Sequence, residues 1–114
     1  MEIKVQVEAG ELFNVKNIEN EVSSLVKNTL YGIETEAKRN CPVDTGRLRG
    51  SITTNIIDDM SGEVGTNVSY CEYVEYGTRY QEAQPYFEPA VKKNQDKLDK
   101  ELDKLIERII KWLM

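Results

Sequence analysis

The last part of the sequence constrains the fold most, because it carries the repeat of a long helix with one apolar side. Two prolines, Pro85 and Pro89, precede a segment in which apolar residues keep a seven-residue rhythm with steps of three and four. Proline is tolerated in the first turn of a helix but not deeper. We therefore predict a helix over about residues 86 to 112.

The apolar residues of this predicted helix form a narrow seam. The seam consists of Val91, Leu98, Leu102, Leu105, Ile109 and Trp112. It can pack within its own domain or against another chain, and packing within the domain is the simpler arrangement. Around it lie seven basic and five acidic residues between Lys92 and Met114. Interleaved charges of this kind are typical of a solvated helix face supported by pairs three or four residues apart.

A second helix is predicted over about residues 17 to 39. Its apolar positions recur at three- and four-residue steps, which places them on one helical face. They are Ile18, Val22, Leu25, Val26, Ile33 and Ala37. Asn40 and Pro42 then supply a stop signal.

Three segments have the pattern of strands. Residues 2 to 8 alternate between apolar and polar, residues 51 to 57 are rich in β-branched side chains, and residues 63 to 68 alternate again. Turn residues between the last two segments predict a hairpin. The chain is therefore expected to be a single α+β domain over residues 1 to 114, with a small mostly antiparallel sheet packed with a long N-terminal helix and a long C-terminal helix.

The composition argues against several classes of function. The absence of histidine removes the usual general base, the commonest metal ligand and any Ser-His or Cys-His nucleophile. The net charge of −5 is the opposite of that in domains that neutralise DNA phosphates. No apolar run is long enough to span a membrane, and no secretory signal pattern is present. We expect no catalysis, no cofactor, no metal, no sequence-specific nucleic-acid binding and no membrane contact.

The two cysteines, Cys41 and Cys71, lack the spacing of a redox or zinc motif. The chain is expected to be cytoplasmic when it is made, and cytoplasmic proteins rarely keep disulfides. Both cysteines are therefore predicted to be thiols.

The segment from Pro42 to Ser51 predicts an ordered turn. Asp44 can accept backbone N–H groups at a turn or helix start, and Gly46 can adopt the positive φ that other residues avoid. Arg47 can reach a carboxylate from the same turn. The glycine spacing fits neither a P-loop nor a dinucleotide-binding fingerprint.

A tyrosine-rich stretch follows the predicted hairpin. It contains Tyr70, Tyr73 and Tyr76 beside Glu75, which suits an interface or a core edge where hydroxyl groups find partners. The stretch is too short for periodicity to decide between a strand and a short helix. Base stacking would need basic surroundings, and glutamates stand there instead. Further on, Tyr86 or Phe87 is expected to anchor the last helix to the core.

Four motifs occur in one order along the chain. They are PVDTGRL at 42 to 48 followed by Ser51-Ile52, VGT at 64 to 66, Tyr70 with YVEYGT at 73 to 78, and QPYF at 84 to 87 with Pro89-Ala90. In order and spacing they closely resemble the lambdoid gene-product-ten-like tail-component family, a relative of the lambda minor tail protein Z. The resemblance covers nearly the whole chain.

The resemblance implies a structural virion subunit that acts in tail completion or head–tail joining within a multi-subunit assembly, without catalysis. The expected partners are other phage tail or neck proteins and further copies of the chain in a ring, and the expected location is the virion, after assembly in the host cytoplasm. The residues expected to form the ordered structural motif are Asp44, Gly46, Arg47, Glu75, Gly77 and Thr78. The candidate interface residues are Tyr70, Tyr73, Leu98, Leu102, Leu105 and Ile109.

Two other functions are compatible with the sequence. The first is a cytoplasmic adaptor that dimerises as a coiled coil through its C-terminal seam. The second, an enzyme, is weaker because no residues mark an enclosed pocket or a raised pKa. Neighbouring genes for portal, capsid and tail-tube proteins would favour the virion protein, and a regulatory operon would favour the adaptor.

Overall fold

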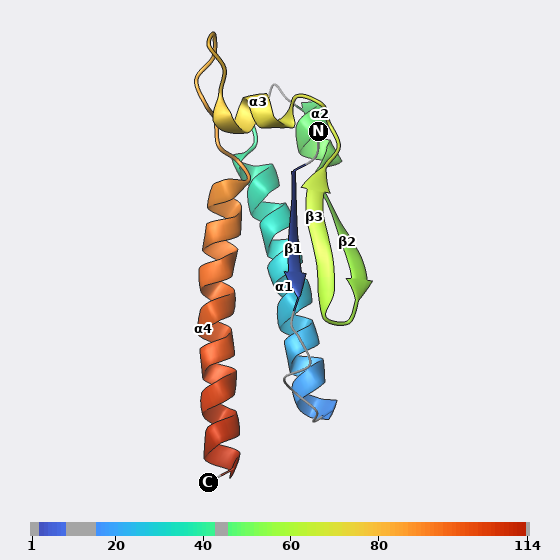
Figure 1. Ribbon diagram of the computed structural model, residues 1–114, viewed down its shortest axis with the longest axis vertical. Helices are drawn as coiled ribbons and strands as arrows, with labels where there is room; N and C mark the ends of the chain where they lie inside the picture. Colours follow the sequence, from blue (N-terminus) through green and yellow to red (C-terminus); the bar gives the residue numbers. More distant parts are fainter. Residues whose placement is uncertain (1–2, 9–15, 43–45, 114) are drawn as a thin grey trace.

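The computed structural model describes the backbone of residues 3–8, 16–42 and 46–113 and the side chains of residues 18–42 and 46–111. Both helices and strands occur along the described part of the chain (Figure 1). In chain order they are β1 (Ile3–Glu8), α1 (Lys16–Asn40), α2 (Gly46–Ser51), β2 (Thr53–Asp58), β3 (Ser61–Thr66), α3 (Cys71–Tyr76) and α4 (Glu88–Leu113). The fold is α+β, with two long helices and one small sheet, as the sequence predicts.

The sheet has three strands in the order β1-β3-β2. Both outer strands are antiparallel to β3, so that Val64 of β3 lies between Val5 of β1 and Thr54 of β2. In the turn between β2 and β3, the Met60 N–H donates to Asp58 Oδ1 at 2.8 Å. The hairpin predicted from the sequence is therefore confirmed. Its second strand is shifted, because it covers residues 61–66 instead of 63 to 68.

The elements form two layers and a cover at one end. Helix α1 lies against the sheet, and α4 runs antiparallel beside α1, on the side away from the β2–β3 hairpin (Figure 1). The short helices α2 and α3 lie at the end where α4 begins (Figure 1). The buried hydrophobic core is formed by Val22, Val26, Leu30, Ile33, Ala37, Cys41, Leu48, Ile52, Val64, Val68, Cys71, Val74, Tyr86, Phe87, Ala90 and Leu105. Most of these residues lie toward the α3 end of the molecule. Few of them belong to α4, and the sides of α4 that face away from α1 are exposed.

The two long helices approach each other closely at one glycine. A Cβ at Gly32 of α1 would overlap the amide oxygen of Asn94 on α4, so only glycine leaves room there. Asn94 is itself buried, and its Nδ2 donates to the carbonyl of Ala90 at 2.8 Å. Elsewhere the helices are joined by ion pairs, Lys93 to Glu36 at 3.2 Å and Arg108 to Glu21 at 2.8 Å.

Part of the segment predicted as a turn and a strand is a helix. Gly46 begins α2 without a positive φ, so the conformational freedom that the sequence offers at this glycine is not used there. Leu48 is fully buried and holds α2 on the core. The Ser51 hydroxyl donates to the Leu48 carbonyl at 2.7 Å and meets the hydroxyl of Thr66 on β3. Ser51 therefore ends a helix, and the strand predicted from residue 51 begins at Thr53.

The undecided tyrosine-rich stretch is helical. Residues 71–76 form α3, in which Cys71, Val74 and Glu75 are buried. Their steps of three and one put all three side chains on one helical face. The opposite side of α3 is exposed to solvent and forms part of the surface at this end of the molecule.

Candidate assembly site

The buried carboxylate of Glu75 ties α3 to the start of α4. Only 3% of Glu75 is exposed, and glutamate is almost never fully buried without a partner. Its Oε1 accepts the backbone N–H groups of Tyr86 at 3.2 Å and Phe87 at 2.9 Å, and its Oε2 accepts that of Glu88 at 3.1 Å. Such donors are left over at a helix N-terminus, where the helix dipole also favours negative charge. Glu75 therefore caps α4 from another helix.

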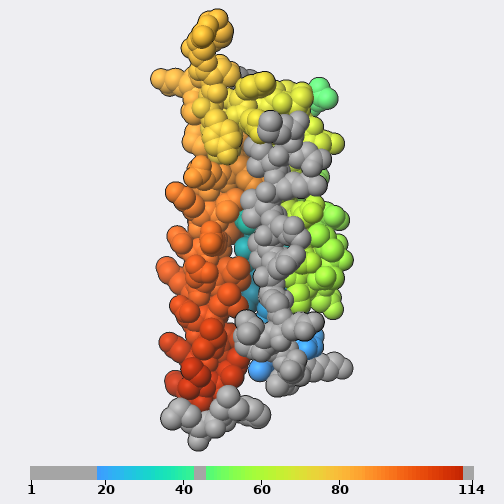
Figure 2. Space-filling view, viewed as in Figure 1, coloured from blue at the N-terminus to red at the C-terminus, as the bar shows by residue number. Residues whose placement is uncertain are grey.

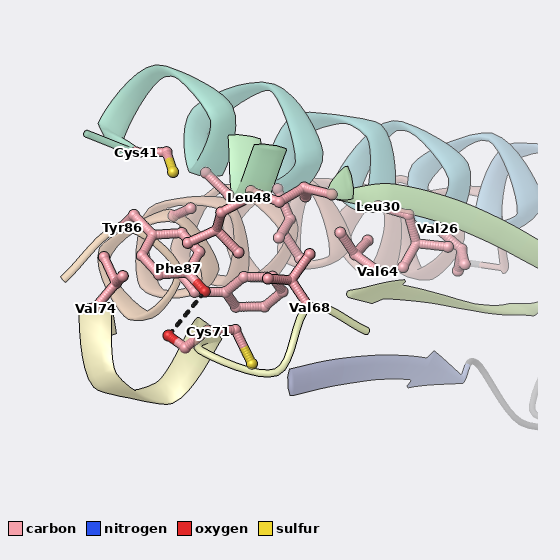
Figure 3. Packing of buried hydrophobic residues seen from close by; sticks show 14 of the residues in the cluster. Val26, Leu30, Cys41, Leu48, Val64, Val68, Cys71, Val74, Tyr86 and Phe87 are labelled. Atoms are coloured by element: carbon pink, nitrogen blue, oxygen red, sulfur yellow. Dashed lines mark hydrogen bonds between the residues drawn. The ribbon is translucent and has the colours of Figure 1, made fainter. Parts of the chain in front are cut away.

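Tyr86 and Phe87 fix the same helix start to the core. Both rings are buried and pack edge to face, with centroids 6.1 Å apart. The Tyr86 hydroxyl donates to the Cys71 carbonyl at 3.2 Å (Figure 3), and Asn40 Nδ2 donates to the Tyr86 carbonyl at 3.4 Å. Burial, reinforced by neighbouring groups that include Glu75, raises the pKa of the Tyr86 hydroxyl well above its ordinary value. Both aromatic residues serve as the anchor predicted from the sequence.

Gly77 opens the loop that leads from α3 to α4. Its φ is +78°, and a Cβ there would lie 2.7 Å from a backbone nitrogen across the loop, so glycine is required for both conformation and space. Thr78 and Gln81 then exchange two backbone hydrogen bonds of 2.9 and 3.4 Å. The Gln84 N–H returns to the Val74 carbonyl at 2.8 Å. The loop is thus a closed arm whose base is fastened to α3.

Three tyrosines are exposed on α3 and on this arm. Tyr73 is 60% exposed, Tyr76 69% and Tyr80 88%. The arm projects beyond the body of the molecule at the α3 end (Figures 1 and 2). Tyrosine is enriched at protein interfaces, because it offers a large apolar ring with a polar tip. We call these three residues the tyrosine cluster. Its frame is set by the Glu75 cap and the Gly77 turn.

The match to a known family extends as far as Gly77, where the arm begins. Residues 13–77 match the family described as "Bacteriophage HK97-gp10, putative tail-component". The chain belongs to this HK97-gp10-like family. No curated protein and no solved structure shows a significant match to the chain. Membership agrees with the structural virion role predicted from the sequence, and the kinship with the lambda protein Z stays a prediction.

The residues predicted as one structural motif of the family lie in separate places. Glu75 and Gly77 belong to the α3 end described above, and Thr78 closes the base of the arm. Gly46 and Arg47 are exposed on α2, and Arg47 makes no hydrogen bond or ion pair with another described residue. Asp44 lies outside the described residues, so the predicted cap at this position stays a prediction.

The candidate interface residues are also divided. Tyr73 is exposed, whereas Tyr70 is half-buried and packs against the core. Of the C-terminal seam, Leu105 is buried and Ile109 packs against the core, while Leu98 and Leu102 are half-buried. The seam is thus used against α1, and a coiled coil through the same residues would have to displace α1. Sequence reasoning missed Tyr80, whose position in a polar loop gave no sign of its exposure.

The cysteines and the carboxylates of the described residues form no metal site. Cys41 and Cys71 are buried thiols, as predicted, and burial raises the pKa of the Cys71 thiol above its ordinary value. Within residues 16–42 and 46–113 no group of His, Cys, Asp and Glu side chains could hold a metal ion. Among the described helices, none combines the length and apolar character needed to cross a membrane.

Proposed function

We propose that the chain is a non-enzymatic structural subunit of a tailed phage or prophage, acting in tail completion or head–tail joining as one copy in a ring. Membership of the tail-component family supports the virion role. The tyrosine cluster carries the structural part of the proposal. It presents two exposed tyrosines on α3 and a third on the arm that projects past the core.

The tyrosine cluster has the properties of a protein-binding surface. Contiguous exposed apolar surface on a small protein usually marks a contact site, and tyrosines are among the residues that contribute most to binding energy. The arm is held by backbone hydrogen bonds at Thr78 and Gln84 and by the Glu75 cap. Little conformational entropy is therefore lost when a partner binds. The partners we propose are other tail or neck proteins.

The absence of catalysis is part of the same proposal. The chain has no histidine, and its buried carboxylate, Glu75, already accepts three backbone N–H groups. A carboxylate engaged in this way is a helix cap, not a general base with access to substrate.

Deletion of the gene from an inducible prophage tests the function. We expect the lysate to contain filled heads with separate or defective tails by electron microscopy, and the wild-type gene supplied in trans to restore infectious particles. The triple variant Tyr73→Ser, Tyr76→Ser and Tyr80→Ser should fail to restore them. Tyr31→Ser is the matched control, because Tyr31 is 49% exposed but lies on α1. Infectious particles without the gene would end the proposal.

A further inference from the structure

Seven charged residues of α4 lie in two rows on either side of its seam, one row basic and the other acidic. Lys97, Lys100, Lys104 and Lys111 follow one another at steps of three, four and seven, so they lie along one side of the helix. We call them the basic flank. Asp96, Asp99 and Asp103 keep the same steps along another side and continue into Ile106 and Ile110. We call these five residues the acidic flank.

The two flanks are matched in height along the helix. Each acidic residue of the pairs Asp96-Lys97, Asp99-Lys100 and Asp103-Lys104 directly precedes a basic one. Neighbouring residues of an α-helix differ by about 100° in direction but by only about 1.5 Å in height. Each of these acidic side chains therefore has a basic side chain at nearly the same height along the helix axis, on the other flank.

The molecule itself makes little use of these charges. All the flank residues are exposed, and among the described residues only Lys104 forms an ion pair, with Glu101 at 3.5 Å. Within each flank like charges stand three or four residues apart, which opposes helix formation in an isolated chain. Figure 2 shows α4 exposed along almost its whole length at one side of the molecule. Opposite charges also stand four residues apart, as in Asp96–Lys100 and Lys97–Glu101, so the helix itself tolerates the pattern while both rows face solvent.

An apolar-floored groove runs beside the basic flank. It lies between α1 and α4 and has a volume of about 640 Å³. Leu25 and Leu105 line its apolar part, and its charged lining is mixed, with Lys104, Arg108 and Lys111 beside Glu21, Glu101 and Glu107. On the acidic flank, Ile106 is 44% exposed and Ile110 is 50% exposed. One flank thus borders a depression with an apolar floor, and the other offers protruding apolar side chains below a row of carboxylates.

We infer that a second copy of this chain occupies the groove, so that the acidic flank of one α4 lies against the basic flank of the next. This inference rests on the proposed function and names the contact that closes its ring. A cyclic ring needs two different, complementary surfaces on every subunit. If the axis runs along α4, neighbouring helices are parallel and at equal height, and Asp99 faces Lys100 of the next copy. Ile106 and Ile110 then enter the neighbouring groove.

Charge complementarity favours a second copy over nucleic acid. A DNA backbone would use the basic flank alone and would be repelled by the carboxylates that lie at the same heights on the same helix. A second copy uses both flanks, and it also covers the two exposed isoleucines.

Charge reversal on the purified full chain tests the contact. The basic-flank variant carries Lys97→Glu, Lys100→Glu and Lys104→Glu. The acidic-flank variant carries Asp96→Lys, Asp99→Lys and Asp103→Lys. Sedimentation velocity over a range of protein concentrations should show self-association at least about tenfold weaker for each variant than for the wild type, since three attractive pairs become repulsive. Added salt should weaken the association of the wild type but not that of either flank variant.

Two controls separate the contact from net charge and from misfolding. A mixture of the two variants should associate again, because each flank then meets an opposite charge. The variant with all six substitutions keeps the net charge of −5 and should associate as the wild type does. Far-UV circular dichroism should be the same for all proteins, because every substituted residue is exposed.

The inference is overturned if neither flank variant differs from the wild type, including the case in which no protein associates, or if the mixture fails to recover. Binding of double-stranded DNA by the wild type, lost in the basic-flank variant and without self-association, would also overturn it. The prophage deletion is independent of these outcomes. If the deletion gives defective tails but the flank variants associate as the wild type does, the proposed function is supported and only this contact is refuted.

Discussion

Replacement of Glu75 tests whether one carboxylate holds the α3 end together. Glu75→Gln keeps the size and one oxygen, but it places an NH₂ group where at least one of the three backbone N–H donors needs an acceptor. Glu75→Ala removes all acceptors. The effect is therefore expected to be graded between the two variants.

The magnitude follows from the contacts. A hydrogen bond to a charged group contributes about 1.5–3 kcal/mol, and a negative charge at a helix N-terminus contributes up to about 1–2 kcal/mol. Glu75→Gln loses one such bond and the charge, which gives a cost of about 2–4 kcal/mol. Glu75→Ala leaves three donors without the carboxylate and should cost about 3–6 kcal/mol, a large part of the stability of a small domain.

Urea denaturation followed by circular dichroism measures these free energies of unfolding. Glu82→Gln is the matched control, because Glu82 is exposed on the arm, and it should change stability by less than about 0.5 kcal/mol. Hydrogen exchange adds a local readout, since the Phe87 and Glu88 amides should lose protection first in the Glu75 variants. If both Glu75 variants unfold at the wild-type midpoint, the carboxylate does not hold the start of α4 and the reasoning fails.

Three further variants test other contacts. Burial raises the pKa of the Tyr86 hydroxyl, so its contribution to the free energy of unfolding is complete below the ordinary tyrosine pKa of 10.0 and is lost as the pH rises above it. Tyr86→Phe should reduce this alkaline loss of stability by up to about 1.4 kcal/mol per pH unit, measured by urea denaturation at a series of alkaline pH values. Gly77→Ala should cost about 1–3 kcal/mol, whereas Gly46→Ala, in a helix with open space around it, should be neutral or stabilising; equal effects in thermal unfolding would refute this. Gly32→Ala should cost about 1–3 kcal/mol, and Asn94→Ala in the same chain should recover part of it; additive effects in a double-mutant cycle would argue against the close approach.

The long elements were predictable because their signals are periodic. The repeat from Val91 to Ile109 predicts α4 to within about two residues at its start, and that from Ile18 to Ala37 does the same for α1. Short elements were harder. Two glycines near Leu48 argue against a helix, yet α2 forms because the Leu48 side chain is buried in the core, and burial overrides local propensity.

The candidate site depends on contacts that a sequence does not show. Glu75 was predicted to be structural, but its partners lie 11 to 13 residues further along the chain, beyond the reach of any local capping rule. The sequence permits a positive φ at Gly46, and the structure has one at Gly77, where the arm turns back over the backbone. Local sequence permits a glycine conformation, and only the packing around the residue selects it.

The late position of α4 in the chain has a consequence for synthesis. Helix α4 packs along α1, and the Glu21–Arg108 pair joins residues 87 positions apart, so α1 leaves the ribosome long before its partner does. In that interval the side of α1 around Leu25 has no cover, while the sheet and α3 can already form. The packing of α4 on α1 is therefore completed only after α4 has been synthesised. The two flanks of α4 take their final positions at the same step.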